Sequence, residues 1–267
     1  MASSKNKKAG FKDQTVLITG GSRGIGFELA RLFLKEGAKV ILVASDPQRL
    51  SKAGEELERE FKTKPYLIVA DLSNEDAPKE IFQAVTAQKF SVDVLVNNAG
   101  IGVYGKFREK ALDRNLKTID INIKALVALT YHFIPSMIEK KRGKILNVAS
   151  TAAFQAVPLE AVYGASKSFV LNFSEALANE LEGTGVSVSC LCPGPTHTGF
   201  FAKDKFTASK MVKKYMMSPP QTAQWGMKAL RENRVLVIAG FRNQLIQVLE
   251  RAFPRKWITK LARRMVE

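Results

Sequence analysis

The sequence predicts a single α/β domain built on a doubly wound parallel sheet. Short β-branched apolar runs alternate with amphipathic segments of helical length, and a glycine-rich turn joins the first run to the first helix. The chain has 267 residues, 46% of them apolar, which is enough for one large core. Strict alternation of strand and helix implies parallel strands joined by right-handed crossovers, with helices on both faces.

Seven apolar runs indicate buried strands, and six segments between them indicate helices. We expect strands at 16–19, 39–44, 66–70, 92–96, 144–148, 186–191 and 235–238. We expect helices near 24–36, 47–61, 75–88, 112–140, 161–182 and 204–231. Neither an internal repeat nor a low-complexity linker divides the chain. One domain over 13–250 is therefore expected, between a basic N-terminus (1–12) and a basic amphipathic extension (251–267).

The chain carries a formal net charge of +16, and much of it lies at the two ends. Residues 1–12 carry +4 and residues 251–267 carry +5. A nucleic-acid-binding domain would show a basic stripe with interleaved aromatic residues on its body, so we expect no nucleic-acid partner. Cys190 and Cys192 have no neighbouring His or Cys pair, which excludes a zinc site and a secreted disulfide framework. No apolar segment follows the first lysines, so we expect no signal peptide and a cytoplasmic protein.

The first predicted strand runs into the turn Thr19-Gly20-Gly21-Ser22-Arg23-Gly24-Ile25-Gly26 and then into an amphipathic helix. Glycines let the backbone approach a pyrophosphate, and the free N–H groups at a helix N-terminus bind it. A plain tight turn is the alternative. The position of the turn directly after the first strand favours dinucleotide binding.

The spacing Thr19-Gly20-x-x-x-Gly24-Ile25-Gly26 resembles the short-chain dehydrogenase/reductase family, and the resemblance covers about residues 14–200. It implies a Rossmann-type fold, a nicotinamide dinucleotide cofactor, a small carbonyl or alcohol substrate, and a homodimer or homotetramer. It also implies that the cofactor is bound by Gly20, Ser22, Arg23, Gly24, Ile25, Gly26, Ser45, Asp71, Leu72, Asn98, Ala99, Gly100, Tyr163, Lys167, Pro193, Gly194, Thr196 and Thr198.

The end of the second strand predicts NADP rather than NAD. An acid at this place would accept the ribose 2′-hydroxyl of NAD and repel a 2′-phosphate, but the strand ends at Ser45 and Asp46 lies just beyond. Arg23 can reach the adenosine ribose, and in similar sequences a basic residue here contacts the 2′-phosphate. Ser45 can donate a further hydrogen bond.

Two further motifs follow predicted strands. Asp71 and Leu72 follow the third strand, where relatives meet the adenine ring, and Asn98-Ala99-Gly100 follows the fourth. A helix cap and a plain turn are the alternative interpretations. After the sixth strand, the resemblance assigns the loop from Pro193 to Thr198 to the nicotinamide carboxamide.

Four residues are candidates for catalysis. Tyr163 and Lys167 are four residues apart and share a helix face, so the ammonium and a nicotinamide cation would lower the pKa of the phenol for acid–base work. Ser150 can hold a carbonyl oxygen, and the resemblance gives Asn122 a helix bend and a proton path. Each has a structural alternative: a surface pair, a cap or a solvent-facing amide.

Two functions from different classes therefore stay open. The first is an NADP-dependent oxidoreductase with Tyr163 as acid and base, and the second is a catalytically silent dinucleotide sensor or scaffold. His197 and His132 are more readily explained by loop contact and packing than by chemistry. An apolar cover near 200–217 suits a hydrophobic substrate, although its residues can equally pack on the sheet: Phe200, Phe201, Phe206, Met211, Met216 and Met217.

The C-terminal extension and two long helices offer surfaces for partners. On a helical wheel Trp257, Ile258, Leu261 and Met265 share one face, opposite several cations. That face could rest on an anionic membrane, or dock on its own domain or a partner subunit, which we consider the commoner arrangement. The resemblance implies subunit contacts through 112–140 and 161–182, using residues such as Leu126, Leu129, Phe169 and Phe173.

Overall fold

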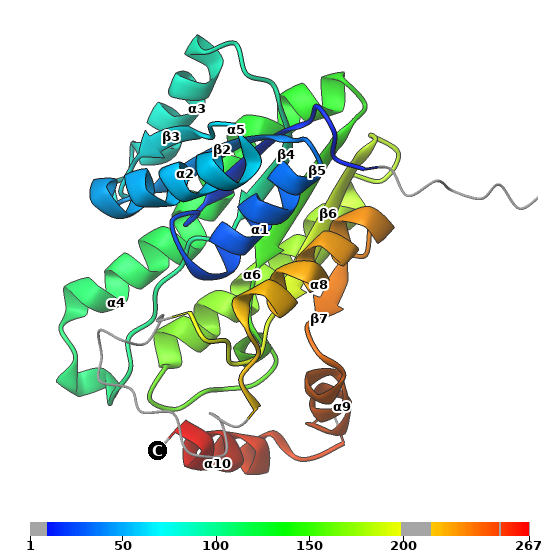
Figure 1. Ribbon diagram of the computed structural model, residues 1–267. Coiled ribbons are helices and arrows are strands. Elements are labelled where there is room, and N and C mark those ends of the chain that lie inside the picture. The colour runs from blue at the N-terminus through cyan, green and yellow to red at the C-terminus, as the bar shows by residue number, and fades with distance from the viewer. Residues whose placement is uncertain (1–9, 199–214, 251, 267) are drawn as a thin grey trace, which may run out of the picture.

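The computed structural model describes residues 10–198, 215–250 and 252–266, and it shows one parallel sheet between two layers of helices (Figure 1). Within the described residues the sheet has seven strands in the order β3-β2-β1-β4-β5-β6-β7, which confirms the predicted fold class. The strands are β1 (Thr15–Thr19), β2 (Lys39–Ala44), β3 (Tyr66–Val69), β4 (Val92–Asn97), β5 (Gly143–Val148), β6 (Val186–Cys192) and β7 (Leu236–Ile238).

The helices cover both faces of the sheet because each carries an apolar stripe. Those of the main body are α1 (Gly24–Lys35), α2 (Pro47–Phe61), α3 (Ala77–Ala87), α4 (Leu112–Ile119), α5 (Ala125–Glu139), α6 (Ala161–Glu180) and α8 (Pro219–Glu232). One core cluster joins α1, α2 and α8 to one face of the sheet, and a second joins α3 and α5 to the other. At the C-terminus follow α9 (Phe241–Glu250) and α10 (Arg255–Val266).

The order of the strands places the site. The chain runs outward from β1 through β2 to β3, then returns to β4 on the other side of β1. The crossovers of β1 and β4 therefore diverge, and an open parallel sheet binds its ligands in the crevice at this switch point, beyond the carboxyl ends of the strands. The glycine turn after β1 and the Asn98 turn after β4 both lie there.

The seven predicted strands and the first five predicted helices are confirmed to within a few residues. The helix expected over 204–231 begins at Pro219, and residues 199–214 are outside the described parts of the chain. Helix α9 was not predicted. Its apolar residues recur at helical spacing, but in the described residues the next element is another helix, α10. The alternation of strand and helix that identified the earlier elements is therefore missing here.

The segment Leu112–Glu139 is continuous, with a π-helical turn, η2 (Asp120–Lys124), between α4 and α5. Its length and composition would also suit a membrane span, but α5 packs on α3 and on the sheet, as a core helix does. This packing corrects one expectation: Leu126 and Leu129 are buried inside the domain and are not free for a partner. Tyr131, of which 75% is exposed, takes their place on the outer face of α5.

Candidate active site

A cavity of about 740 Å³ lies at the carboxyl ends of the strands, and it gathers most of the residues predicted for the site. Its walls come from the glycine turn, the ends of β2, β3, β4 and β6, the start of α6, and the helices α9 and α10. Every predicted cofactor-binding or catalytic residue lines the cavity except Gly26 and Asn122, which lie behind its wall.

The glycine turn leaves no room for side chains. Gly20 and Gly24 have φ angles of 65° and 59°, a region that other residues rarely adopt. A Cβ atom on Gly20 would lie 2.9 Å from Asn98 Nδ2, and one on Gly26 would lie 2.5 Å from the carbonyl oxygen of Gly20. This close packing sets the first turn of α1 directly behind the cavity wall, as a pyrophosphate requires.

Two side chains lock the glycine turn to the neighbouring strand. Asn98 Nδ2 donates to the Thr19 carbonyl oxygen at 2.9 Å, and Thr19 Oγ1 accepts from the N–H groups of Asn98 and Ala99 at 3.0 Å each. The Asn98 turn is therefore part of the cradle of the cavity. Arg23 is the N-cap residue of α1 and lines the cavity; its guanidinium has only donors, so it can bind an anion there but cannot cap the helix.

In the first turn of α2, just beyond the end of β2, Arg49 lies beside the same cavity as Arg23. The sequence did not point to Arg49. Both arginines line the cavity, and the charge of Arg49 helps burial to lower the pKa of Arg23. Asp46 caps α2 by accepting from the Arg49 N–H at 2.9 Å, and its other carboxylate oxygen lies 3.1 Å from Arg49 Nη2. Asp46 also lines the cavity, but its charge is offset by the α2 backbone and by Arg49, and the two arginines leave a net positive charge at this corner. This arrangement suits a 2′-phosphate.

Asp71, after β3, lies where the resemblance places the adenine. Its Oδ1 accepts from the backbone N–H and the hydroxyl of Ser73, and its Oδ2 accepts from Lys117 Nζ at 2.9 Å. Burial raises the pKa of Asp71, but these hydrogen bonds outweigh it and the pKa is lowered. The carboxylate is therefore ionised and fixed, which leaves the backbone beside it to contact a base.

Tyr163 occupies the first turn of α6 and is almost fully buried beside Ser150, which follows β5. Burial raises the pKa of Tyr163, and a hydrogen bond with the Ser150 side chain opposes that effect. Ser150 Oγ also accepts from the Ala152 N–H at 3.1 Å, so it caps a short helix as well as holding the phenol. The phenol is neutral at physiological pH, as a proton donor must be.

Lys167 lies one turn after Tyr163, but its ammonium points elsewhere than expected. Lys167 Nζ donates to the Val148 carbonyl oxygen at 2.8 Å and lies 5.9 Å from the centre of the Tyr163 ring. The expected lowering of the Tyr163 pKa by this cation is therefore absent from the described protein, because burial dominates. Burial also lowers the pKa of Lys167 to about 8.

Asn122 lies in the π-helical turn η2, close to the Gly100 loop and to α6, which carries Lys167. Its Oδ1 accepts from the Ile101 N–H at 2.9 Å, and its Nδ2 donates to the Ile101 carbonyl oxygen and to Ser166 Oγ. A Cβ on Gly100 would lie 3.2 Å from Asn122 Oδ1 and 3.3 Å from Lys167 Nζ, so both groups surround that glycine. Asn122 thereby ties the π-turn to the Gly100 loop and to the helix of the catalytic pair.

The far end of the cavity is built from residues that the sequence analysis did not select. Gln155 and Glu160 come from the segment before α6, and Glu160 is almost fully buried. Gln247, from α9, is also buried, and its Oε1 has no hydrogen-bond partner in the described structure. The helical spacing of apolar residues in α9 was the available signal, but only the fold brings that helix to the cavity.

The loop after β6, the predicted apolar cover and the two histidines complete the predicted residues. Thr198 lies over the glycine turn, 3.1 Å from a Cβ built on Gly24. Met216 lines the cavity, whereas Phe200, Phe201, Phe206 and Met211 lie outside the described residues. His197 is exposed and does not line the cavity, and His132 stacks on Phe82 at 5.3 Å.

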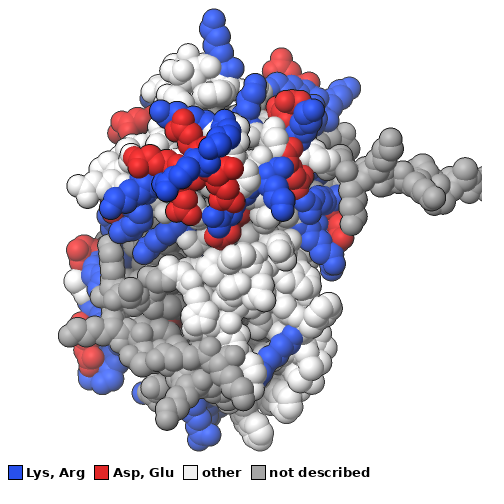
Figure 2. Space-filling view, viewed as in Figure 1, with Lys and Arg blue, Asp and Glu red and all other residues white. Residues whose placement is uncertain are grey.

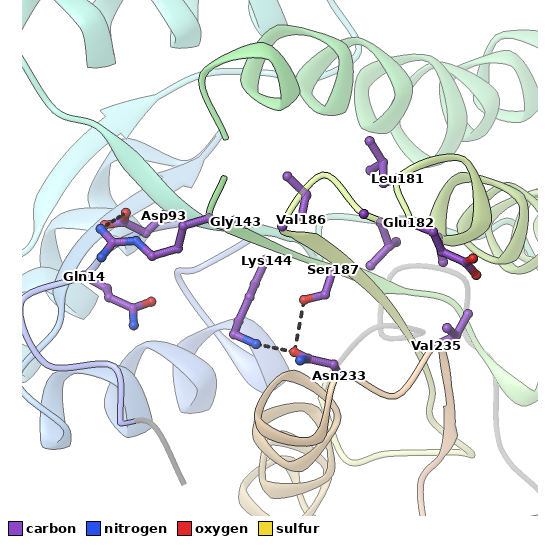
Figure 3. Close-up of a pocket in the computed structure, with 15 residues that line it drawn as sticks. Gln14, Asp93, Gly143, Lys144, Leu181, Glu182, Val186, Ser187, Asn233 and Val235 are labelled. Carbon is purple, nitrogen blue, oxygen red and sulfur yellow. Dashed lines mark hydrogen bonds and ion pairs between the residues drawn. The ribbon is translucent and has the colours of Figure 1, made fainter. Parts of the chain in front are cut away.

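A second cavity, of about 690 Å³, lies at the opposite end of the sheet and contains none of the predicted site residues (Figure 3). There Lys144 Nζ donates to Asn233 Oδ1, and Asp93 pairs with Arg142 at 2.8 Å. Burial lowers the pKa of Lys144. Asp93 and Arg142 neutralise each other, and Lys144 is held by the Leu230 carbonyl oxygen and the Asn233 amide, so these charged groups have a structural explanation.

Comparison with known proteins shows which family shares this sequence and fold. The family model for short chain dehydrogenases matches residues 14–208. A short chain dehydrogenase of Pseudocercospora fijiensis is 37% identical over 193 residues, which span 72% of this chain and 62%, less than two thirds, of that protein. The NADP-dependent 3-hydroxy acid dehydrogenase YdfG of Escherichia coli is 37% identical over 67% of this chain and 71% of its own length. A solved short-chain dehydrogenase from Sphingobium yanoikuyae, in complex with NADPH, has a TM-score of 0.79 at 25% identity, covering 90% of this chain and 94% of that one.

Proposed function

The chain belongs to the short-chain dehydrogenase family, and on that premise we propose that it is an NADP-dependent reductase of carbonyl compounds, with Tyr163 as the proton donor. One observation carries the proposal: a neutral, buried phenol, hydrogen-bonded to Ser150, faces the same cavity as the glycine cradle. When bound, NADPH supplies the hydride. The E. coli relative named for NADP and the NADPH complex of the Sphingobium relative support this cofactor.

Each group of residues in the cavity has its own role in this reaction. Arg23 and Arg49 bind the 2′-phosphate, and the first turn of α1 binds the pyrophosphate. The Ser150 hydroxyl holds the substrate oxygen, so that the Tyr163 phenol can transfer its proton to that oxygen as charge develops there. Lys167 keeps a cation near the ribose, and Asn122 holds the loop against which the ammonium rests.

The cavity walls support a bulky, largely apolar substrate. Ile246, Leu249, Phe253 and Ile258 line the cavity, and its polar lining residues include Glu160 and Gln247. Such a composition binds the body of a ligand by burial and orients it by a few hydrogen bonds. We propose a hydrophobic ketone or aldehyde with at least one hydroxyl or amide donor for Gln247.

On this proposal the protein is a homodimer or homotetramer, as the family resemblance implies, and it is cytoplasmic, which its two free cysteines favour. Phe169 and Phe173 on α6 stack with their ring centres 5.8 Å apart, and Phe169 is exposed, as is Tyr131 on α5. These aromatic side chains offer apolar surface for a subunit contact. A dinucleotide sensor or scaffold without turnover is the alternative. Intact Ser150, Tyr163 and Lys167 favour turnover, since a sensor has no chemical need of all three.

A panel of ketones, aldehydes and alcohols, assayed by the absorbance of NADPH, tests the proposal. We expect steady consumption of NADPH with bulky apolar carbonyls, and slower consumption with short hydrophilic ones. Tight NADPH binding with no turnover on any compound of the panel would favour the sensor instead.

A further inference from the structure

Exposed apolar side chains gather on the two C-terminal helices. Sixteen large apolar side chains are strongly exposed among the described residues, and seven of them lie between 241 and 261. We call these seven the C-terminal apolar face: Phe241, Leu245, Val248, Leu249, Phe253, Trp257 and Leu261, of which between 51% and 80% is exposed. When several large apolar side chains on adjoining elements are exposed together, they commonly mark a contact with a partner or a membrane.

The helices turn one side to the domain and the other side outward. Phe241, Leu245, Val248 and Leu249 follow the i, i+4, i+7, i+8 spacing of one face of α9, while Gln247 is buried. In α10 Ala262 is buried, whereas Trp257 and Leu261 are exposed. Docking on the domain therefore uses only part of the apolar residues of these helices.

The charge of this segment favours an anionic partner. Residues 241–266 contain seven lysines and arginines against one acid, Glu250. Figure 2 shows charged side chains of both signs crowded over α1 and α2, while the surface over α8 and α9 is largely uncharged. A second copy bound through a two-fold axis would bring these cations against their own counterparts. A membrane with anionic lipids offers apolar depth and opposite charge together.

The cavity opens on the same face. Leu249, Phe253 and Leu261 line the cavity, and more than half of each is exposed. The substrate end of the cavity and the C-terminal apolar face therefore share residues. A ligand at this opening would leave the cavity directly onto the surface that these side chains form.

We propose that α9 and α10 form a docking surface for anionic membranes. The C-terminal apolar face enters the interface between headgroups and acyl chains, and Lys256, Lys260 and the neighbouring arginines remain at headgroup level. If the proposed function also holds, a lipophilic carbonyl dissolved in the bilayer reaches the cavity without crossing water. The docking itself does not depend on that function, because vesicle binding is measured without turnover.

Co-sedimentation of the full chain with vesicles tests the docking. We expect binding to vesicles of phosphatidylcholine mixed with phosphatidylserine, and little binding to phosphatidylcholine alone. The triple variant L245S/V248S/W257S, whose residues do not line the cavity, should bind about a hundredfold more weakly. The matched control F107S/L112S removes two exposed apolar residues from another part of the surface and should bind like the parent.

Charge and insertion are measured separately. The variant K256Q/K260Q should lose about tenfold or more in binding to anionic vesicles, whereas K52Q/K64Q should change it little. The chain has two tryptophans, Trp225 and Trp257, and 67% of Trp257 is exposed. Its emission should shift to the blue on vesicle binding, and W257F should abolish the shift.

Three results would overturn the proposal. The first is that the parent fails to bind anionic vesicles. The second is that the triple variant binds as the parent does, which would assign binding to another part of the chain. The third is that light scattering shows a parent dimer that does not bind vesicles, and that the triple substitution turns this dimer into a monomer. A second copy of the chain would then be the partner of this face.

Discussion

Arg23 and Arg49 bring two guanidinium groups to one corner of the cavity, and Asp46 lines the same corner, where its carboxylate caps α2 and pairs with Arg49. Charge-assisted hydrogen bonds of this type contribute about 1.5–3 kcal/mol each. We therefore expect Arg23→Ala and Arg49→Ala each to reduce the preference for NADPH over NADH by about tenfold or more.

Titration of each variant with both cofactors checks this expectation. Asp46→Asn is the control of opposite sign: it keeps an oxygen that can cap the helix and removes the negative charge beside the arginines, so it should not reduce the preference for NADPH. Equal affinities of the parent for the two cofactors would show that the paired arginines do not select the 2′-phosphate.

The pKa of Lys167 places a titration near physiological pH. Burial lowers this pKa to about 8, so the ammonium is present below that pH and is lost above it. If the cation holds the cofactor, kcat/KM for NADPH falls as the pH rises through about 8, because this ratio reports groups of the free enzyme. In Lys167→Arg the charge persists, so the fall should disappear from the pH profile. A profile of the parent that stays flat from neutral to alkaline pH would contradict the role.

Gln247 offers a test of the substrate end. Its buried Oε1 has no partner within the described chain, and a buried acceptor of this kind costs about 1–3 kcal/mol. Gln247→Leu should therefore raise the melting temperature, while KM for the best carbonyl rises and kcat changes little. A higher melting temperature with an unchanged KM would show that Gln247 does not contact the substrate.

At the scale of the elements, α5 and α6 form the outer face on which we expect subunits to meet. Tyr131 is 75% exposed and Phe169 is 39% exposed, an uncommon environment for aromatic residues on core helices. The double variant Tyr131→Glu and Phe169→Glu places charges in this face, so it should turn the oligomer into a monomer by light scattering. Leu245→Glu, on α9, is the control and should keep the oligomer. A monomeric parent at micromolar concentration would refute this interface.

The elements also show why sequence reasoning succeeded or failed. The strands were predictable because each is a short β-branched run, and the site because its motifs follow strand ends that meet at one edge of the sheet. Arg49 and Gln247 were not predictable, because their approach to the cavity depends on how α2 and α9 lie on the domain. Burial of the phenol raises the pKa of Tyr163, and Lys167, whose ammonium bonds to Val148, does not offset that effect. The share of the expected lowering that was assigned to the nicotinamide cation stays a prediction.

At the scale of the whole molecule, one cavity joins the glycine cradle, the Tyr163 phenol and the apolar end formed by α9 and α10. The parts are consistent with one reaction: two cations and a helix terminus for the cofactor, a neutral acid for the substrate oxygen, and apolar walls for its body. The same helices that line the cavity also carry the C-terminal apolar face, so the proposed membrane contact would lie at the opening through which a substrate enters.

The central claim is that Tyr163 donates the proton, and Tyr163→Phe tests it most directly. The variant keeps the ring and its packing and removes the hydroxyl, so NADPH affinity and melting temperature should stay near the parental values. Turnover of the best carbonyl should fall by about 10²–10⁴-fold, the usual contribution of a general acid. Tyr66→Phe, on β3, is the matched control and should leave turnover unchanged. Turnover of Tyr163→Phe at a near-parental rate would contradict the account and assign the proton to another group, with His197 as the next candidate.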